Sequence, residues 1–247
     1  MITQLYKKLG SITALPPVKD NEVLIRNLAH RLLNEINCTE FSPPQLPEKE
    51  KIRQSCLNSI RLLDCDIIMN SSPEDYVYEC LNLTTAVSDV LTACGVLLCR
   101  TKIRPVFRHH GTVYTDAPVK LLLSAITGIV RIFCQICPQG IIYFSLKRNR
   151  EHTVLLAECV NNNRKNAAVS NETADMLKKT AEILNGAFLT AKKDTSFICA
   201  LSMKNPVRDK SRAGYAPDYV ELLIDKMSEV HIGLSGLSDG EKISDLH

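Results

Sequence analysis

The sequence predicts an α+β protein in which a helical hairpin is followed by an α/β sandwich of helices and a sheet. Apolar residues recur every three or four positions over residues 20–37 and 48–70, as in amphipathic helices. Beyond residue 83, helical segments alternate with shorter segments that have the apolar–polar alternation of strands. These patterns divide the chain into an N-terminal extension over 1–19, the hairpin over 20–72, the α/β domain over 73–204, and a C-terminal connector with one helix over 205–247.

The first helix of the hairpin is expected over residues 20–37. Leu24, Leu28 and Leu32 follow one another at intervals of four residues and form an apolar stripe. Three prolines within residues 43–47 end this helix, because proline lacks an amide donor and clashes with the preceding turn.

The second helix of the hairpin is expected over residues 48–70. Its apolar residues form one stripe and are Ile52, Cys56, Ile60, Leu63 and Ile67. A hairpin of two helices cannot cover both of its stripes by itself. The pattern therefore predicts a homodimer in which two hairpins form a four-helix bundle.

The elements of the second part follow from local start and stop signals. The segment Thr115–Pro118 is typical of a helix start, and Asn185 with Gly186 is typical of a helix end. The expected order is a helix over 83–99, a strand over 103–107, a helix over 118–136, strands over 141–149 and 153–160, a helix over 173–184, strands over 187–191 and 196–203, and a helix over 217–230.

The composition argues against several classes of function. With 247 residues, 45% of them hydrophobic, the chain can bury a substantial core. The formal net charge is +3, from 30 basic and 27 acidic residues, which gives no electrostatic footprint for nucleic acid. The apolar runs are too short for a signal peptide or a membrane span, and the ten cysteines lack the spacing of a small disulfide scaffold. We expect a cytoplasmic protein with reduced thiols, no nucleic-acid partner and no membrane insertion.

The order of these elements over residues 20–204 resembles the dimerisation and ATP-binding domains of bacterial two-component sensor histidine kinases. Residues 29–34, AHRLLN, are similar to the phosphoacceptor box of that family, in which His is followed by an acid and, four positions on, by Thr or Asn. Residues 114–138 resemble the stretch that begins with Asp before a helix and ends in Pro before the next strand. Residues 182–186 and 194–197 are similar to a helix end and to the late G-T-x-F turn, with Asp in place of Gly.

The resemblance implies that His30 is the candidate phosphoacceptor and Asn34 a candidate water-orienting residue. Helical spacing places both on one polar stripe with Asn27 and Asn37, opposite the leucines, and we expect this stripe to be exposed. A solvent-facing imidazole with a pKa near neutral can accept a phosphoryl group or pass one on. Arg31 stands where the family has an acid, and a cation there disfavours the imidazolium form.

The resemblance also locates the magnesium site, where this sequence departs from the family. The Asn that ligates magnesium falls on Ile132, and a hydrocarbon side chain cannot ligate a cation. The Asn one helical turn earlier falls on Gly128. A shift in register would not restore a ligand of this kind, because no Asn occurs between Thr115 and Ile142. We therefore predict no metal site.

The adenine and lid positions differ as well. The acid that reads adenine would follow the second strand, where the chain has Asn161, Asn162 and Asn163. Amides can hydrogen-bond a base, so these three are the candidate nucleotide-binding residues of a degenerate site. The glycine-rich hinge of the lid falls on residues 171–174, where the carboxylate of Glu172 opposes a triphosphate.

A separate motif, the C-x-x-C spacing of Cys134 and Cys137, is found in redox and metal sites. The chain has no second pair at zinc-finger distance, and these two residues end an apolar helix. Buried structural thiols are the better interpretation.

The sequence thus predicts a histidine-kinase-like two-component signalling protein with a degenerate ATP site and without autokinase activity. It would act as a phosphotransfer protein or as a non-catalytic scaffold for a response-regulator receiver domain or a partner histidine kinase, with no cofactor. Two alternatives stay open. One is an active sensor histidine kinase with an atypical site for ATP and magnesium, and the other is a purely structural protein-interaction module.

Overall fold

The computed structural model describes residues 19–38, 46–137, 139–160, 171–193, 196–206 and 214–237. Its longer helices are α2 (Lys19–Cys38), α3 (Leu46–Asn70), α4 (Leu83–Leu97), α5 (Val119–Ile136) and α6 (Asn171–Ile183), and short helices are η2 (Pro73–Asp75), α7 (Tyr219–Ile224) and α8 (Glu229–Gly233). The strands are β1 (Glu79–Asn82), β2 (Lys102–Arg108), β3 (Tyr114–Ala117), β4 (Gln139–Arg148), β5 (His152–Val160), β6 (Phe188–Lys193) and β7 (Ser196–Lys204). The predicted α+β class and the helical N-terminal part are confirmed.

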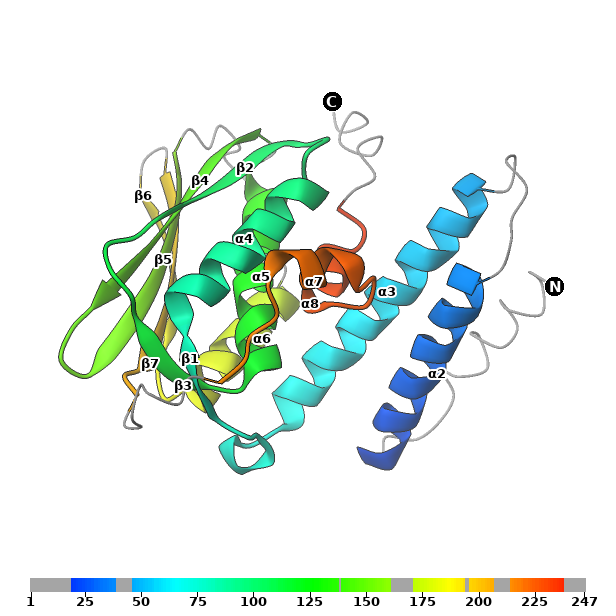
Figure 1. Cartoon of the computed structure of the whole chain (residues 1–247), viewed down its shortest axis with the longest axis horizontal. Helices are drawn as coiled ribbons and strands as arrows, with labels where there is room; N and C mark the ends of the chain where they lie inside the picture. Colours follow the sequence, from blue (N-terminus) through cyan, green and yellow to red (C-terminus); the bar gives the residue numbers. More distant parts are fainter. Residues whose placement is uncertain are drawn as a thin grey trace.

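A five-stranded sheet of order β2-β4-β5-β7-β6 forms the outer layer, and α4, α5 and α6 cover one of its faces (Figure 1). The pairing of β2 with β4 is parallel and the other pairings are antiparallel. The turn between β4 and β5 is closed by Asn149, whose side chain accepts hydrogen bonds from the amides of Glu151 and His152. The two alternating segments therefore form a hairpin, as their pattern predicts.

Helix α5 is the centre of the core. Over its 18 residues the mean hydropathy is 1.7, which is sufficient for a membrane span by length and composition. In the structure 72% of this helix is buried inside the protein, as in the core helix of a globular domain. Phe133 on α5 and Phe197 on β7 make an edge-to-face contact with ring centroids 5.6 Å apart, which joins this helix to the sheet.

A small second sheet was not expected from the sequence. Strands β1 and β3 pair antiparallel, with Cys80 opposite Asp116 and Leu81 opposite Thr115. Residues 115–117, interpreted as part of a helix start, belong to β3, and α5 begins only at Val119.

The buried face of α2 differs from the predicted leucine stripe. Ala29, Leu33 and Ile36 are buried against α3, whereas Leu28 is 37% exposed. The side chain of Leu24 lies outside those that the structure describes. On α3, the predicted residues Ile52, Cys56 and Ile60 are buried, and further along Cys65 and Ile68 join the core of the α/β domain. Part of the apolar surface of α3 is therefore covered within the chain.

The C-terminal segment contains two short helices instead of one. Asp225 ends the first helix and its side chain accepts a hydrogen bond from the Met227 amide, while Ser228 is the N-cap of the second. Side chains that bond nearby amides compete with helix continuation, which explains the break. In Figure 1 α7 and α8 lie between the hairpin and the helical layer, and α8 contacts both α3 and α5.

Candidate functional site

His30 lies on an open groove between α2, the start of α5 and the C-terminal segment. The groove has a volume of about 540 Å³ and is lined by Arg26, His30, Val119, Lys120, Leu123, Tyr215, Pro217, Asp225, Met227 and Glu229. His30 is half-buried, so the expectation that it is solvent-exposed is wrong. The reason is that residues 215–229 lie along this side of α2. Asn34, one turn further along α2, is exposed.

The surroundings of His30 favour its neutral form. Burial lowers its pKa below the ordinary value of 6.5, and the nearby cations Arg26 and Lys120 lower it further, while Asp225 acts in the opposite direction. A neutral imidazole has an unprotonated nitrogen, which is the nucleophilic form at neutral pH. The two cations would also attract a phosphoryl group.

Arg26 connects His30 to the second helix of the hairpin. Its Nε lies 2.8 Å from Oδ1 of Asp64 on α3, and both side chains are mostly buried. Burial raises the pKa of Asp64, although Arg26 and Lys120 act to lower it. This ion pair holds the guanidinium on the His30 side of the hairpin.

The resemblance places the magnesium ligands of the histidine-kinase family at Gly128 and Ile132, and in this chain both positions on α5 are covered. Ile132 is fully buried in the core. At Gly128, a Cβ would come 3.1 Å from Cε of Met176 and 3.5 Å from Cδ2 of Leu177, so α6 packs directly against the helix there. At both positions this face of α5 therefore packs against apolar side chains.

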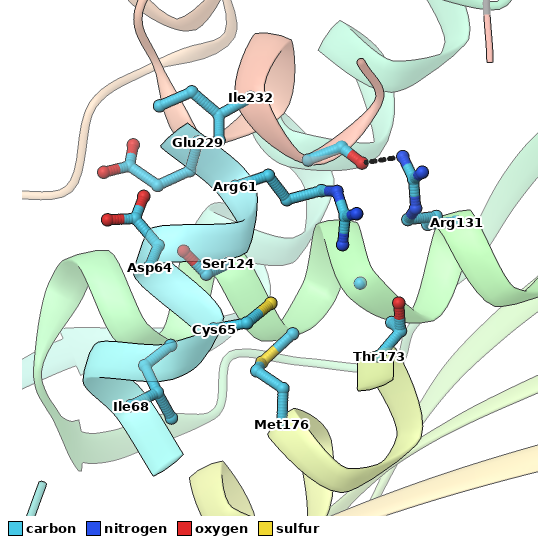
Figure 2. A pocket seen from close by; sticks show the side chains of 12 residues that line it. Arg61, Asp64, Cys65, Ile68, Ser124, Arg131, Thr173, Met176, Glu229 and Ile232 are labelled. Atoms are coloured by element: carbon cyan, nitrogen blue, oxygen red, sulfur yellow. Dashed lines mark hydrogen bonds between the residues drawn. The ribbon is translucent and has the colours of Figure 1, made fainter. Parts of the chain in front are cut away.

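The chain's own C-terminal segment covers α5 beside these positions. Nη1 of Arg131 donates hydrogen bonds to the carbonyl oxygens of Gly233, at 2.9 Å, and Ser235, at 2.8 Å (Figure 2). These carbonyls lie at the C-terminal end of α8, where a cation is favourable. Arg131 was not identified from the sequence, although a lone arginine within an apolar 18-residue helix is a signal for a buried polar contact.

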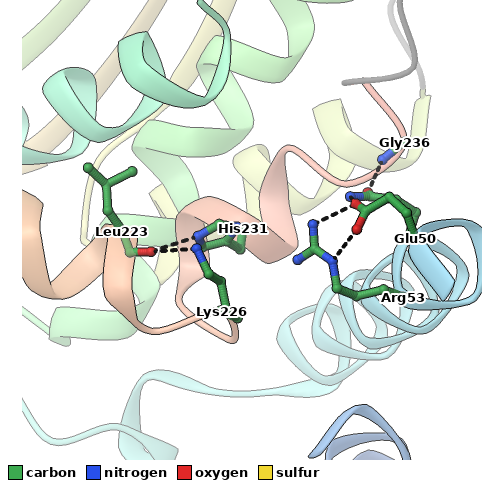
Figure 3. A network of polar contacts seen from close by, with 7 residues as sticks. Glu50, Arg53, Leu223, Lys226, His231 and Gly236 are labelled. Carbon is green, nitrogen blue, oxygen red and sulfur yellow. Dashed lines mark hydrogen bonds and ion pairs between the residues drawn. The ribbon is translucent and has the colours of Figure 1, made fainter. Parts of the chain in front are cut away.

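A second set of contacts attaches the same segment to α3. Oε1 of Gln54 accepts a hydrogen bond of 3.1 Å from the Gly236 amide, next to the ion pair of Arg53 with Glu50. Within the C-terminal segment itself, His231 Nε2 lies 3.2 Å from the carbonyl oxygen of Leu223, which also accepts a hydrogen bond from Nζ of Lys226 (Figure 3). Burial lowers the pKa of His231. The C-terminal segment is therefore fastened on two sides.

The lid hinge position is the start of helix α6. Glu172 there lies 3.5 Å from Nη1 of Arg61, so it connects α6 to the hairpin. Asn161, Asn162 and Asn163 lie outside the described residues. Among the residues that the structure describes, no group of three potential metal ligands occurs.

The C-x-x-C pair lies at the end of α5. Cys137 is buried, and burial raises the pKa of Cys134 to about 12. Both are free thiols in the structure.

No protein-family profile and no curated protein sequence matches this chain. Solved structures do. The Acinetobacter baumannii histidine kinase AdeS matches with a TM-score of 0.52 and 12% identity over 74% of this chain and 95% of that chain. Full-length ShkA, solved in complex with AMPPNP, matches with a TM-score of 0.54 and 8% identity over 74% of this chain and 46% of that chain. At these identities the likeness concerns the fold, and the chain has a histidine-kinase-like fold.

Proposed function

We propose that this chain is a cytoplasmic, histidine-kinase-like signalling protein with a degenerate ATP site, which acts in phosphotransfer or as a scaffold for a receiver domain or a partner histidine kinase. The observation that carries the proposal is that other parts of the chain cover the face of α5 on which the resemblance places the magnesium ligands. Gly128 and Ile132 face packed apolar groups, and Arg131 is used to hold the chain's own α8. Gly128 and Ile132 offer no side-chain oxygen ligands to the magnesium ion of a nucleotide complex.

The surroundings of His30 support phosphotransfer over a purely structural role. In that step, a ring nitrogen of neutral His30 attacks the phosphorus of an aspartyl phosphate on a receiver domain. The P–N bond forms, the P–O bond to the aspartate breaks, the carboxylate leaves, and the imidazole releases its remaining N–H proton to solvent. Arg26 and Lys120 line the same groove and would offset the charge of the phosphoryl oxygens. Phosphotransfer of this kind needs no bound nucleotide.

We place the second copy of the chain against the exposed apolar residues of the hairpin. Leu28 on α2 is 37% exposed, and Leu62 and Met69 on α3 are 41% and 44% exposed. Burying them against a second hairpin is favourable, because apolar surface is removed from water. Leu62→Lys should convert the dimer to a monomer in light scattering, whereas Lys178→Gln, on exposed surface of α6, should leave it unchanged. A wild-type chain that is monomeric at high concentration would refute the dimer.

The proposal is tested in two steps. Calorimetric titration of the full chain with ATP and magnesium should give no binding heat and no incorporation of phosphate. A phosphorylated receiver domain is then offered to wild type, His30→Ala and, as the control at another histidine that is exposed, His110→Ala. Label should move to wild type and His110→Ala alone.

Tight ATP binding with label on His30 would identify an active kinase and refute the degenerate site. Receiver binding without transfer of label would leave the scaffold role and remove the role of His30. Failure of both binding and transfer with every receiver of the source cell would refute both forms of the proposal.

A further inference from the structure

A small, partly open space lies where α3, α5, α6 and α8 meet. It has a volume of about 30 Å³ and is lined by Arg61, Asp64, Cys65, Ile68, Ser124, Gly128, Arg131, Thr173, Met176, Glu229, Ile232 and Gly233. One water molecule requires roughly 10–15 Å³ measured in this way. The space therefore has room for about two or three atoms of the size of water.

Hydrogen-bond donors from three helices meet at one end of this space. Figure 2 shows the guanidinium of Arg61 beside that of Arg131, which is directed at a carbonyl oxygen, and the hydroxyl of Thr173 on the same side of the space. Thr173 is in the first turn of α6, a helix of 13 residues, where backbone amides and the helix dipole favour negative charge. The carboxylates of Asp64 and Glu229 lie at the opposite end in the same view.

Two of these donors are buried without an acceptor. Thr173 is only 1% exposed, and its Oγ1 has no hydrogen-bond partner among the residues that the structure describes. Arg131 is 9% exposed, and its Nε likewise has no partner within that part of the chain. Buried polar groups are normally paired, because an unpaired donor loses its hydrogen bonds to water without replacement.

The charge at this end of the space is also uncompensated. Within the described part of the chain, no carboxylate forms an ion pair with Arg131. Burial and, to a smaller extent, the neighbouring Arg61 lower the pKa of Arg131 to about 10, while Glu172 acts in the opposite direction. The pair of Arg61 with Glu172 is long, at 3.5 Å, and Glu172 is 41% exposed. Arg61 and Arg131 thus line one end of a space whose carboxylates, Asp64 and Glu229, lie at the other end.

We propose that this space binds a single small anion of the size of chloride, which accepts hydrogen bonds from Arg61, Arg131 and Thr173. The anion would bridge α3 of the hairpin and α5 and α6 of the domain, so its binding stabilises their association. A nucleotide is too large for a space of about 30 Å³. The site is independent of phosphotransfer by His30, which lies on a different groove.

The test uses the full chain and the halide itself. Crystals grown in sodium bromide should show an anomalous difference peak between the two arginines and Thr173. In solution, the melting temperature should rise with chloride or bromide relative to sodium gluconate at equal ionic strength, because an anion that binds only the folded state stabilises it. Sulfate and phosphate should not reproduce the rise.

Two variants separate binding from folding. Thr173→Val removes the hydroxyl at nearly constant volume, and Arg61→Gln removes one charge from a partly exposed side chain. Each should weaken the apparent chloride affinity at least tenfold, whereas Lys178→Gln, on the exposed side of the same helix, should keep the wild-type response. An anomalous peak only at other positions, equal chloride responses in wild type and Thr173→Val, or a rise produced by phosphate but not chloride would each overturn the proposal.

Discussion

Gly233 ends α8 against the middle of α5, and replacing it with alanine tests whether the C-terminal segment covers that helix. A Cβ at Gly233 would lie 2.4 Å from Cγ2 and 3.1 Å from Cβ of Thr127. Carbon atoms in contact prefer about 3.5–4.0 Å. Thr127 is fully buried and its hydroxyl is held by the Leu123 carbonyl at 2.9 Å, so its methyl cannot easily rotate away. Gly233→Ala must therefore push α8 away from α5.

The expected loss of stability is the balance of two effects. Inserting a carbon into a packed region destabilises by about 1–3 kcal/mol, and replacing a helical glycine with alanine recovers about 0.5–1 kcal/mol. We expect a net loss of up to about 2.5 kcal/mol. Gly95→Ala in α4 is the matched control, because a Cβ there meets only Cγ of Pro105, at 3.9 Å. It should stabilise the protein by about 0.5–1 kcal/mol.

A second substitution identifies the clash. Thr127→Ser removes the Cγ2 methyl and keeps the hydroxyl, so combined with Gly233→Ala it should recover about 1 kcal/mol relative to the sum of the single variants. Urea unfolding measures the free energies, and limited proteolysis within residues 214–237 reports detachment of α8. Equal stability of Gly233→Ala and Gly95→Ala, or additive effects in the double variant, would refute this account of the packing.

Three further outcomes follow from the structure. The pKa of His30 measured by NMR should lie below 6.5, and Lys120→Gln should raise it because a repelling cation is removed. Since the unfolded chain has the higher pKa and is protonated first, His30 should reduce the stability of the protein as the pH falls below 6.5. An unshifted pKa would contradict the burial of His30. Of the nine cysteines described, Cys99 alone is exposed and should react first with iodoacetamide at pH 8 as followed by peptide mass spectrometry; earlier labelling of another described cysteine counts against the structure. Gly186→Ala should abolish soluble expression, because its Cβ would lie 1.9 Å from the backbone oxygen of Ser202, and a stable variant would show that this turn is formed differently.

Periodicity located the helices and the long strands because each of these elements buries one face. Burial alternates along β5 and in the centre of β4, and α5 is predominantly apolar over 18 residues, so these elements were predictable to within two residues. The four-residue strand β1 is too short to show a period, and it is stabilised by pairing with residues 114–117, which is a long-range contact. Local pattern therefore failed where an element depends on a distant partner.

The candidate site was predicted in part. The resemblance selected His30, and helical spacing selected its polar neighbours on α2. The half-burial of His30 results from residues 215–229, which lie far from it in the sequence. The single helix predicted at 217–230 is two helices, because Asp225 accepts a hydrogen bond from the Met227 amide and the Ser228 hydroxyl donates one to the Leu222 carbonyl. The adenine-reading asparagines at 161–163 stay a prediction.

The sequence by itself determined the order of the longer helices and strands, because this is a matter of local period. That Ile132 and Gly128 stand at the positions of magnesium ligands follows from the resemblance and stays a prediction. Only the tertiary structure decided which surface of the helices is covered and by what. Arg131 donates a hydrogen bond to Ser235, which lies 104 residues further along the chain, and Arg61 donates one to Glu172, which lies 111 residues further along. Contacts at such separations depend on how the elements pack, which periodicity within one segment does not encode.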